Sequence, residues 1–184
     1  CQPHQGAGYF EVADEKVQNF YTEKYGVVHP TKQGLKIPEM FDGAINKDVK
    51  AVWIIGEDIV QTDPNSAHVV QAMNSLELLV VQEIFMSETA KLATVVLPGT
   101  TFLEKNGTFT NTERRIQRVN QAVPPLPGTK TDGMIVTDMM QKLGFDQPTY
   151  DADQVLAEIA DIVPFFKGVT RERLGKMGLQ WPVQ

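Results

Sequence analysis

Residues 51–55 read Ala51-Val52-Trp53-Ile54-Ile55, a short apolar run that ends at Gly56. Two more short apolar runs follow it, 78–81 (Leu-Leu-Val-Val) and 93–97 (Ala-Thr-Val-Val-Leu), and Pro98-Gly99 ends the last one. Continuous apolar runs of this length, rich in β-branched residues, are typical of strands buried on both faces of a parallel sheet. We therefore expect three strands, at about 51–55, 79–82 and 93–97.

Segments of helical length separate these runs. In the first, Asp63 can cap a helix, Pro64 fits its first turn, and apolar positions continue from Ala67 to Leu76. In the second, residues 86–92 are enough for a helix of two turns. Because β-α-β crossovers are right-handed, the three strands are expected to be parallel. The sequence thus predicts an α/β fold: a three-layer, Rossmann-like domain with a mostly parallel sheet.

The flanks predict further elements around this core. Helices are expected at 14–25, which Gly26 follows, and at 131–143, which Thr131 or Asp132 can cap and Gly144 follows. Shorter helices are expected at 37–45, 153–162 and 170–177. Asn106-Gly107 is a turn signal, with extended segments expected at 108–110 and 115–119. We interpret 1–184 as a single domain, made of an N-terminal helical and loop part (1–47), an α/β core (48–150) and a C-terminal helical segment (151–184).

Composition excludes several classes of protein. The 184 residues are enough for one domain with a real core, and the net charge of −6 argues against nonspecific nucleic-acid binding. No apolar stretch approaches the roughly 20 residues that a membrane-spanning helix needs. Cys1 is the only cysteine, so no cysteine spacing suits zinc or an iron–sulfur cluster. With no targeting segment in view, a cytoplasmic location is expected.

Polar residues follow the predicted strands where a ligand would bind. Gly56-Glu57-Asp58 follows the first strand and Gln82-Glu83 ends the second. In open parallel sheets, ligands bind outside the carboxyl ends of the strands, near a reversal of strand order. Carboxylates and amides there suit ribose hydroxyls or the N1 and N2 groups of guanine. The alternative is that such loops are polar anyway, and the pattern alone does not decide between the two.

Known catalytic and phosphate-binding motifs are missing. No Gly-x-Gly-x-x-Gly follows a strand and no P-loop occurs, which argues against a free-standing NAD or ATP enzyme. The three histidines are far apart, and no serine lies in a nucleophile elbow. From the residues alone, we expect an α/β domain that binds a cofactor or nucleotide and has no catalytic or metal-binding residues of its own.

Five blocks, in order, resemble the molybdopterin oxidoreductases, and formate dehydrogenases most closely. The most distinctive is Glu104 to Gln117, which matches the pattern E-x-x-G-T-F-T-N-x-E-R-R-x-Q. The other four blocks are Gly56-Glu57-Asp58 with Asp63-Pro64-Asn65, Val80 to Ala90, Ala93 to Pro98, and Gly178 to Pro182. The block Gly178 to Pro182 resembles the segment that leads into the next domain of formate dehydrogenase catalytic subunits.

The resemblance implies a cofactor and its contacts. It points to molybdopterin guanine dinucleotide, bound by Asp58, Gln82, Glu83, Lys105 and Asp132. Lys105 would face the pyrophosphate or ribose, and Asp132 the donors of guanine. The strand-end residues Gly56 and Glu57 complete the predicted site. The chain departs from the family pattern twice, with Ile59 where many relatives have proline and Glu83 where aspartate is usual.

The resemblance also implies a larger parent enzyme. In such enzymes two molybdopterin guanine dinucleotides hold one molybdenum or tungsten ion, and an iron–sulfur cluster lies nearby. The parent is expected to oxidise formate to carbon dioxide, whereas this chain lacks the metal ligand and is expected to be inactive by itself. We expect it to begin after the active-site segments and to end before the carboxyl-terminal pterin-binding domain. Expected partners are the remaining domains and the electron-transfer subunits, with no nucleic acid and no membrane contact.

Two other functions remain open from the sequence. The chain can be the same domain of another molybdopterin oxidoreductase, such as one resembling nitrate reductase or the complex I large subunit. It can also be a nonenzymatic module that binds a nucleotide. The pair Arg114-Arg115 is equally consistent with cofactor contact and with a loop knitted against neighbouring structure, so neither arginine is included in the predicted site.

Overall fold

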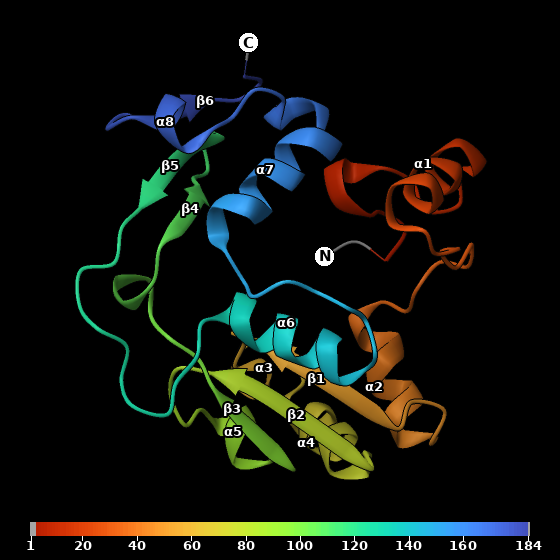
Figure 1. Cartoon of the computed structure of the whole chain (residues 1–184). Helices are drawn as coiled ribbons and strands as arrows, with labels where there is room; N and C mark the ends of the chain where they lie inside the picture. Colours follow the sequence, from red (N-terminus) through yellow and green to blue (C-terminus); the bar gives the residue numbers. More distant parts are fainter. Residues whose placement is uncertain (1–2, 184) are drawn as a thin grey trace.

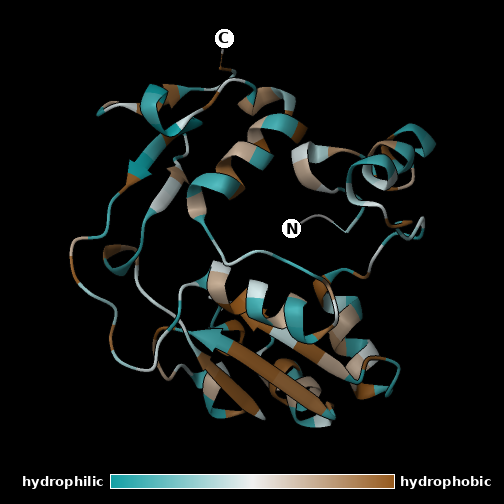
Figure 2. Cartoon of the chain, in the orientation of Figure 1, coloured by the Kyte–Doolittle hydropathy of each residue, from teal (hydrophilic) through white to brown (hydrophobic). Residues whose placement is uncertain are grey.

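The computed structural model describes residues 3–183, so Cys1 lies outside it. Its centre is a sheet of three strands in the order β1-β2-β3. The strands are β1 (Ala51–Ile55), β2 (Leu78–Glu83) and β3 (Val95–Pro98), and both pairings are parallel. The predicted strands and their direction are confirmed. Figure 2 shows β2 as hydrophobic along most of its length and hydrophilic at its arrowhead, where Gln82 and Glu83 lie.

Helices cover both faces of this sheet, which confirms the α/β class. Figure 1 shows α6 (Asp132–Lys142) on one side and α4 (Ser66–Ser75) with α5 (Glu88–Lys91) on the other. The apolar core on the α4 side includes Val69 and Val81, both 0% exposed. Helix α2 (Ile37–Ile45) packs against α4 there. Since both crossovers are right-handed and the strand order follows the sequence, α4 and α5 share one face, and this three-stranded sheet contains no reversal of strand order.

The helix that follows β1 begins later than predicted. Asn65, not Asp63, caps α4, because its side-chain oxygen accepts the His68 N–H at 3.3 Å. Asp63 accepts the Asn65 N–H at 2.8 Å, so its carboxylate is used in the preceding turn, and Pro64 lies before the cap rather than in the first helical turn. A short helix that the sequence did not indicate, α3 (Ile59–Thr62), comes between β1 and this turn.

Two predicted helices are only single turns. The segment 86–92 was expected to form two turns, but the Ser87 side chain accepts the Ala90 N–H at 3.1 Å. Ser87 is therefore the cap, and α5 begins only at Glu88. The segment 170–177 forms only α8 (Arg171–Leu174), because Gly175 adopts a φ of 50° and ends the helix. In both cases a local cap determines the length more strongly than the apolar pattern does.

A second sheet is antiparallel and has its own core. It contains β4 (Gly107–Thr110), β5 (Arg115–Val119) and β6 (Leu179–Gln180), with β5 in the middle. Ile116 of β5 is 0% exposed and packs with α7 (Ala152–Ile162) and α8. The segment 151–184 is therefore not helical throughout. The turn signal Asn106-Gly107 lies at the start of β4, which begins at Gly107. The hairpin turn itself lies between Thr110 and Arg115.

The N-terminal part packs beside α7. It consists of the short helix η1 (Ala7–Tyr9) and of α1 (Glu15–Tyr25), which ends at Gly26 as predicted. Asp14, expected as the first residue of this helix, is instead its cap. Tyr25 donates its hydroxyl to Glu158 of α7 at 2.8 Å, which ties this part to the second sheet. The remaining short helices are η2 (Phe102–Glu104) and η3 (Pro164–Phe166).

Candidate functional site

Three of the predicted site residues come together at the carboxyl edge of the parallel sheet. Gln82, in the central strand β2, donates from Nε2 to Oδ1 of Asp132 at 2.8 Å. Lys105 donates from Nζ to Oδ2 of the same carboxylate at 2.6 Å. Asp132 is the first residue of α6, and Thr131 caps that helix by accepting the Met134 N–H. The carboxylate is thus held by a strand, a loop and a helix start, and we call these three residues the edge trio.

The edge trio has one polar atom without a partner. Gln82 is 1% exposed, and its Oε1 has no hydrogen-bond partner within residues 3–183. Buried polar atoms without a partner are costly, so such an acceptor often marks a place for a water or ligand donor. Burial raises the pKa of Asp132, but the hydrogen bonds from Lys105 and Gln82 outweigh that effect and hold the pKa below its usual value. Asp132 is therefore a carboxylate at neutral pH.

Tyr150 completes the wall next to the edge trio. A Cβ at Gly133 would lie 2.1 Å from the Tyr150 ring, so only glycine lets this ring pack against the start of α6. Burial, followed by the charges of Asp132 and Asp151, raises the pKa of the Tyr150 hydroxyl. Sequence reasoning missed Tyr150 and Gly133. The only available signal was the position of Gly133 inside a predicted helix, where glycine usually has a packing reason.

Two cavities adjoin Lys105. One of about 250 Å³ is lined by Lys105, Asp132 and Tyr150 together with apolar residues of α7. The other, of about 490 Å³, is lined by Lys105 and Tyr150 with Arg171 on its rim. The first of these spaces combines a cation, a carboxylate and an aromatic ring, groups that can contact the phosphate, the hydroxyls and the base of a nucleotide.

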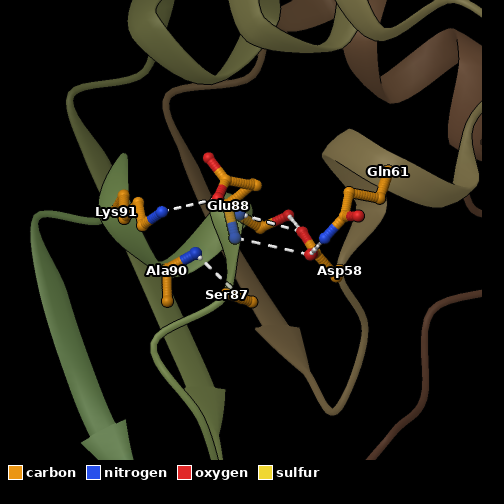
Figure 3. A network of polar contacts seen from close by, with 7 residues as sticks. Asp58, Gln61, Ser87, Glu88, Ala90 and Lys91 are labelled. Atoms are coloured by element: carbon orange, nitrogen blue, oxygen red, sulfur yellow. Dashed lines mark hydrogen bonds and ion pairs between the residues drawn. The ribbon is translucent and has the colours of Figure 1, made fainter.

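Asp58 lies at the same edge but is used differently. Figure 3 shows its carboxylate turned toward the start of α5. Oδ1 accepts the Thr89 N–H at 3.0 Å and the Thr89 hydroxyl at 2.7 Å, while Oδ2 accepts the Glu88 N–H at 3.4 Å and a bond from Gln61. Partial burial raises the pKa of Asp58, but the bonds from Thr89, Gln61 and Glu88 hold it below its usual value. Thr89, which the sequence did not single out, is 0% exposed and also accepts the Val60 N–H.

The other predicted residues lie apart from the edge trio in their contacts. Gly56 has a φ of 63°, a conformation that favours glycine, and its N–H donates to the Gln82 carbonyl at 2.9 Å. Glu57 is exposed and accepts the Thr62 hydroxyl at 2.8 Å. Glu83 accepts the N–H of Ile84, its neighbour in the chain, at 2.7 Å. Gln82, Lys105 and Asp132 therefore form the candidate site, and the side chains of Glu57, Asp58 and Glu83 are hydrogen-bonded to other residues.

The sequence around this site matches a known protein family. The model of the molybdopterin oxidoreductases matches residues 7–142, which is more than half of the chain. The chain belongs to the molybdopterin oxidoreductase family. The matched range contains both the edge trio and the Asp58 network, and membership in this family implies a molybdopterin cofactor.

Individual relatives agree with the family. The chain is 41% identical over 182 residues to a putative formate dehydrogenase of Staphylococcus haemolyticus, covering 98% of this chain and 18% of that protein. It is 44% identical over 166 residues to the F420-dependent formate dehydrogenase 1 subunit alpha of Methanococcus maripaludis, covering 88% and 24% respectively. The chain thus spans about a fifth to a quarter of the length of these relatives.

A solved structure supports the fold. Acetylene hydratase from Pelobacter acetylenicus matches with a TM-score of 0.61 at 21% identity, over 74% of this chain and 19% of that one. At this identity the likeness concerns the fold alone. Within residues 3–183, no helix is long and apolar enough to cross a membrane, and no three His, Cys, Asp or Glu side chains gather in a way that could hold a metal ion.

Proposed function

We propose that this chain is the cofactor-binding part of a molybdenum or tungsten formate dehydrogenase, and that it binds the guanosine end of molybdopterin guanine dinucleotide. The observation that carries the proposal is the edge trio, in which a buried amide acceptor, a carboxylate and an ammonium group converge at the carboxyl edge of a parallel sheet. The cofactor would supply the redox chemistry of the parent enzyme through its metal, and this chain would bind and orient the nucleotide end.

The residues present fit that group. Guanine offers the N1–H and N2–H₂ donors, which suit the carboxylate of Asp132 and the unpartnered Oε1 of Gln82. Lys105 is a compact positive charge, suited to a phosphate or a ribose oxygen. Without a ligand, Lys105 and Asp132 neutralise each other in an ion pair. A bound nucleotide would replace part of this pair with its own contacts to each residue.

Asp58 and Glu83 remain predicted contacts of the cofactor, with a smaller expected contribution to binding than the edge trio. Both carboxylates hydrogen-bond within the chain, Asp58 to α5 and Glu83 to the Ile84 N–H. Asp58 therefore contributes mainly by fixing the loop after β1 against α5. The remaining domains of a longer polypeptide and its electron-transfer subunits are the proposed partners of this chain.

A nucleotide titration tests the proposal on the 184-residue chain. Guanosine diphosphate should bind more tightly than adenosine diphosphate, because adenine cannot donate from N1. Asp132→Asn should weaken the guanosine complex roughly tenfold or more, since hydrogen bonds to a charged group contribute about 1.5–3 kcal/mol. Asp138→Asn is the matched control, because Asp138 lies on the same helix and pairs with Lys130 away from the edge trio. Equal affinity for both nucleotides, or no effect of Asp132→Asn, contradicts the proposal.

The longer parent protein allows a second test. Glu83→Gln and Asp58→Asn should be scored there by the guanine nucleotide bound per folded protein. Full occupancy in both variants would remove these two residues from the site and leave the edge trio to account for binding.

A further inference from the structure

A separate cavity of about 710 Å³ lies at the β4–β5 turn of the second sheet. Parts of the chain far apart in sequence form its walls: the η1 turn with Tyr9, the β4–β5 turn with Arg114, the end of α7 with η3, and Trp181 near the carboxyl end. None of Gln82, Lys105 and Asp132 lines this cavity. It is therefore distinct from the proposed nucleotide site, and the inference below does not rest on that proposed function.

Arg114 is the one charged side chain in the lining. Its guanidinium carbon lies 4.6 Å from the centre of the Trp181 ring. Within residues 3–183 the Arg114 guanidinium has no hydrogen bond or ion pair, whereas the neighbouring Arg115 pairs with Glu113 at 2.9 Å. Stacking uses the face of a guanidinium and leaves the N–H groups at its edge able to donate. The two neighbouring arginines thus differ: Arg115 forms an ion pair within the turn, whereas the N–H groups of Arg114 can donate to a ligand.

The backbone at Arg114 is also unusual. Its φ is 65°, a left-handed conformation that costs a side chain other than glycine and is often found at functional positions. The turn is held in this form by the Arg114 N–H to Asn111 carbonyl bond at 2.9 Å and the Trp181 N–H to Arg114 carbonyl bond at 3.0 Å. The structure therefore fixes Arg114 over the indole ring through its backbone.

The rest of the lining is mainly apolar and aromatic. Phe165 meets the Trp181 ring edge-on, with the ring centres 4.6 Å apart, and Phe166 and Val163 add further apolar surface. The indole N–H of Trp181 is buried and has no hydrogen-bond partner within residues 3–183. The wall thus offers aromatic surface, unpartnered donors and a single positive charge.

We propose that this cavity binds a small aromatic carboxylate. Its carboxylate would accept two parallel N–H bonds from the edge of Arg114, the geometry that a guanidinium favours. Its ring would pack against Trp181 and Phe165, where aromatic pairs gain from offset or edge-to-face contact. A polyphosphate is a poor match because one cation cannot balance it and the surrounding wall is apolar.

Fluorescence quenching tests this directly. The chain has two tryptophans, so a Trp53→Phe background leaves Trp181 as the only indole. The probe is 4-nitrobenzoate, whose nitroaromatic ring quenches tryptophan on contact, and neutral 4-nitrobenzamide reports collisional quenching. We expect saturable quenching by the carboxylate only, unchanged by saturating guanosine diphosphate. Arg114→Gln should raise the dissociation constant about tenfold or more, and Arg114→Lys by less.

Arg118→Gln is the control variant, because Arg118 lies on β5 and donates to Asn120, outside the cavity lining. Thermal unfolding of each variant establishes that it is folded before the comparison. Linear quenching that is equal for both probes overturns the proposal, as does unaltered affinity in a folded Arg114→Gln chain. Binding by the 184-residue chain but not by the complete parent protein overturns it too, because a segment of the parent would then fill the cavity.

Discussion

Replacing Asp58 by alanine should destabilise the chain, although Asp58 was predicted as a contact of the cofactor. Its carboxylate accepts both the N–H and the hydroxyl of Thr89, which is 0% exposed, so truncation leaves two buried donors without their partner. A hydrogen bond to a charged group contributes about 1.5–3 kcal/mol, and part of the loss is recovered by water reaching the exposed Gln61 side. We expect the free energy of unfolding to fall by about 2–4 kcal/mol.

Urea unfolding at neutral pH, followed by far-UV circular dichroism, measures this change. Asp58→Asn keeps an oxygen for Thr89 but loses the charge, so it should cost about 1 kcal/mol. Glu57→Ala is the control, since Glu57 is exposed and such positions usually change stability by less than about 0.5 kcal/mol. If Asp58→Ala unfolds at the same urea concentration as the parent chain, the hydrogen bonds from Thr89 to Asp58 do not stabilise the fold and the reasoning fails.

The same network makes the effect depend on pH. The pKa of Asp58 is held below its usual value in the folded chain, so the unfolded state binds its proton first as the pH falls. The stabilisation is complete above the unfolded pKa, which is about 3.9, and it is lost as the pH drops through the folded pKa. The gap in unfolding free energy between the parent chain and Asp58→Asn should therefore narrow below about pH 4.

Three further predictions follow from close contacts and titration. Gly133→Ala should destabilise the chain by about 1–3 kcal/mol in urea unfolding, despite alanine's higher helix propensity, because its Cβ would lie 2.1 Å from the Tyr150 ring; unchanged stability would show that the ring moves freely. Gly178→Ala should lower the midpoint of thermal unfolding, because the added Cβ would lie 2.3 Å from the Ile116 carbonyl oxygen and the φ of 72° disfavours alanine. Gly144→Ala is the control: Gly144 also has a positive φ, but a Cβ there meets no atom within 4 Å, so it measures the backbone strain alone. Burial, then Glu158, raises the pKa of Tyr25 to about 12, so an ultraviolet titration should include a tyrosinate that forms near pH 12, and Glu158→Gln should lower the pKa of Tyr25 without reaching the usual value.

The sequence predicted the parallel layer well because its signals are local. Three apolar runs identify β1, β2 and β3, and the helix that ends at Gly26 was recognised from its apolar spacing and from that glycine. The errors in helix length were also local: Asn65 and Ser87 both cap later than the apolar pattern suggests. Propensity and periodicity do not determine which of two nearby polar side chains captures a backbone N–H.

The site was predicted in part. Gln82 was found from its place at a strand end, whereas Lys105 and Asp132 came only from the family resemblance, and the structure brings the three together. The role of Asp58 was not visible, because its partner Thr89 lies on a different helix and only the fold makes them neighbours. The contact of Tyr150 with Gly133 escaped notice for the same reason.

The antiparallel sheet has a consequence for how the chain folds. Its middle strand, β5, completes its pairing only with β6, which lies near the carboxyl end, after α6, α7 and α8. The parallel layer closes through short loops and can form early, but β5 must keep one edge open until nearly the whole chain is available. An open strand edge is a template for pairing with other chains. Until β6 is available, the residues of β5 that pair with it, Arg115 and Ile116, have an unpaired strand edge, and a truncation before Leu179 would leave that edge unpaired.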